Sequence, residues 1–148
     1  MKQDKTRVGV IGVGYLGRFH AQKYAAMNNV TLTGVVDVDQ ERAELVAREC
    51  GTVSFIDYRQ LLDQVDAVSI VVPTIHHHQT ALNCLEQGID ILLEKPMTTT
   101  LEEADELIKL AAEKQCIFQV GHLERFNPAV LAMQPLLQNP LFIEAHRL

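Results

Sequence analysis

Three glycines near the start of the chain place the strongest constraint on its fold. Gly12, Gly14 and Gly17 form the pattern G-x-G-x-x-G between a short apolar run, residues 7–11, and a predicted helix, residues 16–27. In such a unit the first glycine permits a tight turn, the second lets a pyrophosphate approach the backbone, and the third lets helix and strand pack closely. The helix N-terminus offers unpaired N–H groups and a positive dipole end to the phosphates. The pattern indicates a dinucleotide site, although glycines at this spacing also serve ordinary turns.

An aspartate at the end of the second predicted strand strengthens this interpretation. Asp37 closes residues 31–37 at the position whose carboxylate binds the adenosine ribose hydroxyls in dinucleotide-binding folds. A carboxylate there repels the 2′-phosphate of NADP, and Val38 offers no compensating cation, whereas Arg42 could reach in from the next helix. The sequence therefore predicts NAD as the cofactor and disfavours NADP.

The rest of the chain alternates short apolar runs with amphipathic helical patterns. Strands are predicted at residues 52–55, 67–72, 89–93 and 116–120, and helices at residues 40–50, 76–87 and 100–113. Asp57 with Gln60 and Thr100 with Glu103 have the spacing of capping boxes. In the last helix, Leu107, Ile108 and Ala111 are expected to face inward. This order predicts an α/β fold with a doubly wound parallel sheet, a dinucleotide-binding Rossmann domain over residues 6–127.

Composition and charge restrict the kinds of partner that the protein is expected to bind. The chain has 148 residues, a net charge of −6 and no basic cluster, which argues against nucleic acid as a partner. Its apolar runs are too short to span a bilayer and its N-terminus lacks a signal-peptide pattern, so we expect no membrane association and a cytoplasmic location. Cys50, Cys84 and Cys116 are expected to be buried thiols.

Two further segments follow strands, at the edge where doubly wound sheets bind ligands. In the first, residues 72–78, three adjacent histidines point about 100° apart on a helix and cannot converge on one ion, so no metal site is predicted. His77 is expected to line the nicotinamide side of the cleft, with a solvated helix start as the alternative.

The second segment is Glu94-Lys95-Pro96. A lysine ending a buried strand is expected to be partly desolvated, and it could exchange a proton with a hydroxyl oxygen that is losing hydride. The proline could fix a tight turn through a cis bond. The alternative is an ordinary surface pair of glutamate and lysine.

The segments VGVIGVGYLGRFH, VVDVD, VVPTIHHH, LLEKPMTTT and VGHLERFNP together resemble the glucose–fructose oxidoreductase/inositol dehydrogenase (Gfo/Idh/MocA) family in order and spacing. The resemblance covers nearly the whole chain and implies an NAD(P)-dependent sugar dehydrogenase. It implies that Lys95 is catalytic and that Pro96 is cis. It also implies that the cofactor contacts Gly12, Gly14, Tyr15, Leu16, Gly17, Asp37, Val72, Pro73, Thr74, His77, Glu94, Lys95 and Pro96.

The same resemblance places Gly121, His122, Arg125 and Pro128 near the substrate, with His122 and Arg125 as candidate substrate residues. The form of this stretch is most similar to members that oxidise nucleotide-linked amino sugars, which suggests a UDP-linked amino sugar. From the residues alone, Arg125 could equally form an ion pair with Glu124 or Glu144.

Family members are longer and carry a second α+β domain that supplies a further acid/base. The resemblance therefore predicts that residues 128–148 are a linker and the first strand of that domain, and that the chain is incomplete and inactive alone. A short helix is expected near residues 129–133. The strand at residues 141–148 is expected to be disordered or to pair with another chain, with an extra edge strand of the same sheet as the alternative.

The predicted activity is hydride transfer from a sugar secondary alcohol to the nicotinamide. Two alternatives stay open at this point, a non-catalytic NAD-binding module or redox sensor, and an NAD-dependent glycosidase. We expect the full-length protein to be a homo-oligomer.

Overall fold

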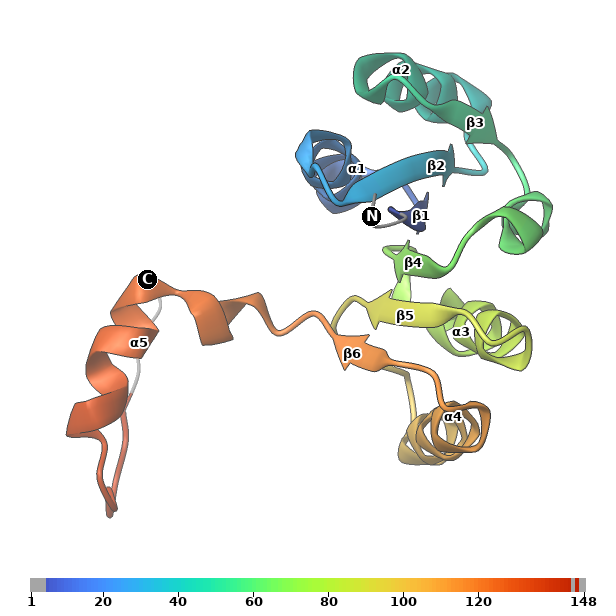
Figure 1. Cartoon of the computed structure of the whole chain (residues 1–148). Helices are drawn as coiled ribbons and strands as arrows, with labels where there is room; N and C mark the ends of the chain where they lie inside the picture. Colours follow the sequence, from blue (N-terminus) through green and yellow to red (C-terminus); the bar gives the residue numbers. More distant parts are fainter. Residues whose placement is uncertain (1–4, 145, 147–148) are drawn as a thin grey trace.

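Six parallel strands form one sheet in the order β3-β2-β1-β4-β5-β6. The structure is a computed structural model that describes residues 5–144 and 146. The strand order reverses between β1 and β4, which makes the sheet doubly wound, as predicted (Figure 1). The strands are β1 (Thr6–Ile11), β2 (Val30–Val36), β3 (Val53–Phe55), β4 (Ala67–Ile70), β5 (Asp90–Leu93) and β6 (Phe118–Val120).

Four helices cover the two faces of the sheet, because side chains of a strand alternate between its faces. In β1, Val10 packs in the core under α1 and α2, whereas the next residue, Ile11, packs in the core under α3 and α4. Val35 and Val36 divide in the same way in β2. Figure 1 shows α1 on the opposite side of the sheet from α3 and α4. The helices are α1 (Tyr15–Ala26), α2 (Gln40–Cys50), α3 (His77–Glu86) and α4 (Leu101–Lys114).

The helix ends confirm one predicted capping box and correct the other. Thr100 accepts a hydrogen bond from the Glu103 N–H, and the Glu103 carboxylate accepts one from the Thr100 N–H, so the box of α4 is complete. Asp57 instead caps a single 3-10 turn, Tyr58–Gln60, by accepting from the Arg59 N–H. The turn is too short for Gln60 to serve as the third residue of an α-helix.

Two predictions about burial were wrong in part. Ile108 is 53% exposed, because α4 turns only one face to the sheet and that face carries Leu107 and Ala111. Cys84 is buried, but Cys50 and Cys116 are only partly buried at the helix and loop ends. None of the helices within the described residues is long and apolar enough to cross a membrane.

The chain leaves the sheet after β6 in short turns that stand apart from the Rossmann layers (Figure 1). A 3-10 helix η4 (Leu123–Phe126) leads into α5 (Pro128–Met133), which matches the short helix expected there, and into η5 (Gln134–Leu136). The described residues 141–144 form no strand and pair with no sheet edge, so the alternative of an extra edge strand of the same sheet was wrong for them, whereas pairing with another chain stays a prediction. Residues 145, 147 and 148 lie outside the described residues.

Candidate functional site

The glycine-rich turn brings β1 and α1 closer together than side chains would allow. Gly12 has a φ of +86°, and a Cβ there would lie 2.5 Å from the Val71 carbonyl oxygen. A Cβ on Gly17 would lie 1.8 Å from the Gly12 carbonyl oxygen. Both glycines therefore serve the close packing of strand, turn and helix that the motif predicts.

Gly14 has the opposite environment. A Cβ on Gly14 would meet no atom within 4 Å, so the space beside it is open. It is the N-cap of α1, and no side chain caps the helix there. The open space and the uncapped N–H groups at the positive end of a 12-residue helix fit a pyrophosphate.

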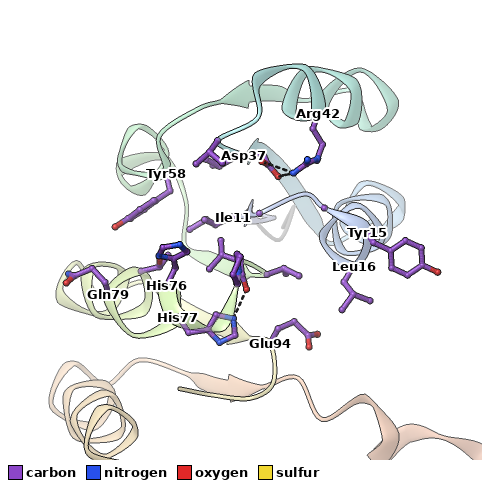
Figure 2. A pocket seen from close by; sticks show the side chains of 18 of the residues that line it. Ile11, Tyr15, Leu16, Asp37, Arg42, Tyr58, His76, His77, Gln79 and Glu94 are labelled. Carbon is purple, nitrogen blue, oxygen red and sulfur yellow. Dashed lines mark hydrogen bonds and ion pairs between the residues drawn. The ribbon is translucent and has the colours of Figure 1, made fainter. Parts of the chain in front are cut away.

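Asp37 is fixed against the same turn. Its carboxylate is 7% exposed and accepts hydrogen bonds from the N–H groups of Val13 and Asp39, each at 3.0 Å. Arg42 approaches it from α2, with Nη1 3.2 Å from Oδ1 (Figure 2). Arg42 also contacts Asp39. The aspartate thus couples the end of β2 to the glycine-rich turn, with its outer edge at the cleft.

One cleft joins the predicted cofactor residues along the carboxyl ends of the strands. Its volume is about 830 Å³, within the range of about 300–1,000 Å³ that is common for ligand pockets. Figure 2 shows Asp37 at one end and Glu94 at the other. The predicted residues that line it are Gly12, Gly14, Tyr15, Leu16, Asp37, Val72, Pro73, His77, Glu94 and Lys95.

The remaining predicted residues are not among the described residues that line this cleft. Gly17 acts through packing, and Thr74 and Pro96 lie in the turns after β4 and β5. His122 and Arg125 are exposed on the segment that follows β6. Within the described part of the chain Arg125 forms no ion pair, which corrects the alternative of a pair with Glu124 or Glu144.

Part of the cleft lining was not predicted from the sequence. Ile56, Asp57 and Tyr58 follow the short strand β3, and Gln79 and Thr80 come from the first turn of α3. A positional signal was available for the first group, because the residues just after each parallel strand meet at the same edge of the sheet. This signal is weak for β3, which is only three residues long.

The three adjacent histidines separate, each with a different environment. His77 is 1% exposed, and the carbonyl oxygens of Val72 and Pro96 each lie 2.9 Å from one of its ring nitrogens. It therefore ties the turn after β4 to the turn after β5, which excludes the solvated helix start. His76 is exposed at the cleft, and His78 pairs with Glu106 on α4 at 2.8 Å.

The segment Glu94-Lys95-Pro96 ends β5 at the cleft, and its Lys95–Pro96 bond is cis, as predicted. Glu94 is 5% exposed, and its Oε2 accepts a hydrogen bond from the Lys95 N–H at 3.1 Å. The Lys95 side chain is exposed, so the expected desolvation was wrong for this chain. The alternation at the strand end turns Glu94 inward and sends Lys95 outward to the cleft mouth.

Comparison with known proteins agrees with this geometry. Residues 6–122 match the Gfo/Idh/MocA family, described as an oxidoreductase family with an NAD-binding Rossmann fold. The chain belongs to this oxidoreductase family. Its fold and its cofactor class, both predicted from the sequence, are thereby confirmed.

Relatives within the oxidoreductase family are dehydrogenases. UDP-N-acetylglucosamine 3-dehydrogenase of Acidithiobacillus ferrooxidans is 47% identical over 143 residues, which are 96% of this chain and 45% of that protein. Its solved structure superimposes with a TM-score of 0.84, covering 90% of this chain and 43% of that one. The scyllo-inositol 2-dehydrogenase (NAD(+)) of Bacillus subtilis is 37% identical over 86% of this chain and 38% of that protein.

A solved scyllo-inositol dehydrogenase of Lactobacillus casei contains bound NAD(H) and scyllo-inositol. It is 25% identical, with a TM-score of 0.83, and the match covers 90% of this chain and 41% of that one. This chain of the oxidoreductase family therefore spans less than half the length of the relatives it matches.

Proposed function

We propose that this chain is the cofactor-binding half of an NAD-dependent dehydrogenase that oxidises a secondary alcohol of a sugar. One observation carries the proposal: a single cleft connects Asp37 and the glycine-rich turn at one end with Glu94 and Lys95 at the other. A dinucleotide bound along it has its adenosine ribose at Asp37 and its nicotinamide near Lys95.

Each group of residues has a separate task in this proposal. The turn at Gly14 and the start of α1 hold the pyrophosphate, and the Asp37 carboxylate accepts hydrogen bonds from the ribose hydroxyls. NAD, when bound, supplies the hydride acceptor. The exposed amino group of Lys95 stands at the cleft mouth, where as an ammonium it can stabilise the negative charge that develops on a sugar hydroxyl oxygen, or as the free amine it can accept the hydroxyl proton.

A UDP-linked amino sugar is the substrate that we propose for the whole protein. The relative that oxidises such a sugar matches 96% of this chain at 47% identity. His122 and Arg125 are exposed on the segment after β6, and both carry donors that suit the phosphates of a nucleotide sugar.

The location and assembly of the whole protein are further parts of the proposal. Cys50, Cys84 and Cys116 are free thiols, which suits a reducing cytoplasm. We propose a homo-oligomer for the whole protein, since its exposed segment after β6 carries many apolar side chains.

Calorimetric titration of this chain with NAD and NADP tests the cofactor assignment. We expect NAD to bind at least about tenfold more tightly than NADP, because the buried Asp37 carboxylate meets the 2′-phosphate with a like charge. Asp37→Asn should reduce the difference between the NAD and NADP affinities. Equal binding of the two cofactors, or binding of neither, would contradict the assignment.

Lys95→Ala tests the catalytic assignment in the whole protein. We expect turnover of UDP-N-acetylglucosamine to fall by at least about 100-fold, the contribution common for acid–base groups, while NAD affinity changes little. Lys109→Ala is the matched control, since the Lys109 side chain is 79% exposed and pairs with Glu113 on α4. Unchanged turnover in Lys95→Ala would remove Lys95 from the mechanism.

A further inference from the structure

A network of buried and partly buried polar side chains lies behind Glu94, and the proposed function does not use it. It runs from α1 through β4 to the end of β5. The Tyr24 hydroxyl lies 2.8 Å from Ser69 Oγ, and His20 Nδ1 lies 3.2 Å from the same oxygen. His20 Nε2 then lies 3.5 Å from Glu94 Oε1. Ser69 is fully buried, and the His20 side chain is 13% exposed.

The hydrogen-bond donors of this network can all point from Tyr24 toward Glu94. If the Tyr24 hydroxyl donates to Ser69 Oγ, the Ser69 hydroxyl is free to donate to His20 Nδ1. The ring then carries its proton on Nε2, which faces Glu94. Burial lowers the pKa of His20, and the nearby Glu94 only partly offsets this effect, so the ring is neutral at neutral pH. The network of Tyr24, Ser69 and His20 therefore presents a dipole to Glu94 and not a positive charge.

Neighbouring atoms also bury the Glu94 carboxylate on the sides away from His20. Its side chain is 6% exposed, and Oε1 is buried without a hydrogen bond from any described residue. Gly121, after β6, lies so close that a Cβ there would be 2.8 Å from Oε1. Lys95 is the adjacent cation, but its side chain is exposed and its charge is weakened by water. Glu94 nevertheless lines the cleft (Figure 2).

We propose that Tyr24, Ser69 and His20 position the Glu94 carboxylate at the nicotinamide end of the cleft, where its charge favours the oxidised, cationic cofactor over the reduced, neutral one. The inference rests on the proposed function, which places the nicotinamide near Glu94. A neutral histidine orients the carboxylate without cancelling its charge, and low polarity around a buried group strengthens its attraction for a cation. His20 is thus a positioning residue that acts through Glu94.

The ratio of NAD⁺ affinity to NADH affinity is the quantity that tests this proposal. Both affinities are measured by calorimetry on this chain and on Glu94→Gln, which keeps the shape of the side chain and removes its charge. We expect the ratio to fall about tenfold in Glu94→Gln, as the loss of one partly buried charge predicts. Glu106→Gln is the matched control, because Glu106 is also paired with a histidine but is 58% exposed on α4 and outside the cleft lining. Its ratio should equal that of the unmodified chain.

A second variant and a spectroscopic measurement make the test independent of how well Glu94→Gln folds. His20→Lys places a cation beside Glu94 and should lower the ratio to a similar extent. Nitrogen NMR on the unmodified chain should find His20 neutral at pH 7.5, with its proton on Nε2, and Ser69→Ala should change that tautomer balance.

The outcomes separate this inference from the proposed function. An unchanged ratio in Glu94→Gln or in His20→Lys, or a positively charged His20 ring, would overturn the inference while leaving the cofactor site in place. Failure of the unmodified chain to bind either NAD⁺ or NADH would overturn the proposed function, and this inference with it.

Discussion

At the scale of single residues, the glycines of one motif serve different purposes. Gly17 is closed in by the carbonyl oxygen of Gly12, so its missing Cβ allows β1 and α1 to pack. Gly14 borders open space, so its missing Cβ leaves room for a ligand. The motif alone does not separate a packing glycine from a binding one, but the surroundings of each Cβ position do.

Alanine at each position should separate stability from binding. Gly17→Ala forces the backbone apart, and we expect the free energy of unfolding to fall by about 3 kcal/mol. Gly14→Ala replaces an N-cap glycine whose φ of −63° alanine can adopt, and it should cost less than about 1 kcal/mol. Its NAD affinity should nevertheless fall by about tenfold or more, because the new methyl group occupies the space for the pyrophosphate. Chemical denaturation and calorimetry measure the two effects. Full NAD affinity in Gly14→Ala would contradict the assignment of the phosphate site.

At the scale of elements, local sequence decides where helices begin and tertiary contacts decide which face is buried. The capping box of Thr100 and Glu103 starts α4 through two side chains that are only three residues apart in the sequence. The burial of Leu107 and Ala111, and the exposure of Ile108, depend instead on where the sheet lies relative to the helix axis.

Removal of the Thr100 cap should weaken α4. Thr100→Ala leaves the Glu103 N–H without its side-chain acceptor, and the free energy of unfolding at pH 7 should fall by about 1 kcal/mol. Glu102→Gln, at an exposed position of the same turn, is the control and should change stability by less than half as much. Urea denaturation measures both. Equal effects of the two substitutions would show that the cap contributes nothing specific.

The pH dependence of this box follows from Glu103. The Thr99 hydroxyl, which donates to the Glu103 carboxylate at 2.7 Å, holds the pKa of that carboxyl below its usual range. Since the folded-state pKa is lowered, the stabilisation is present above the unfolded-state pKa of about 4.3 and is lost as the pH falls through the folded-state pKa. The stability difference between Glu103→Gln and the unmodified chain should therefore shrink below about pH 4.

At the scale of the whole molecule, the Rossmann layers and the segment after β6 differ in how they are held. The layers share two buried cores, whereas residues 123–144 bury no side chain. Large apolar side chains are exposed along this segment, among them Phe126, Leu136, Leu141, Phe142 and Ile143. Folding stability therefore resides in the residues up to about Gly121.

Deletion of residues 128–148 should leave the Rossmann layers intact. We expect the free energy of unfolding to change by less than about 1 kcal/mol and NAD affinity to stay the same, since α5 makes its contacts with η4 and η5. Urea denaturation and calorimetry on the shortened chain are the measurements, with the full 148 residues as the reference. A loss of several kcal/mol would show that the segment packs on the sheet.

Sequence alone determined the order of strands and helices, the glycine-rich turn, the position of Asp37 and the complete box at Thr100, because each depends on neighbours a few residues apart. The structure decided what long-range packing controls. His77 became a buried tie between two turns, and Lys95 became exposed at the cleft mouth, because the ends of β4 and β5 lie side by side. The described residues 141–144 form no strand, because a strand needs a partner edge and none lies beside them. The polar network from Tyr24 to Glu94 likewise depends on neighbours that only folding brings together.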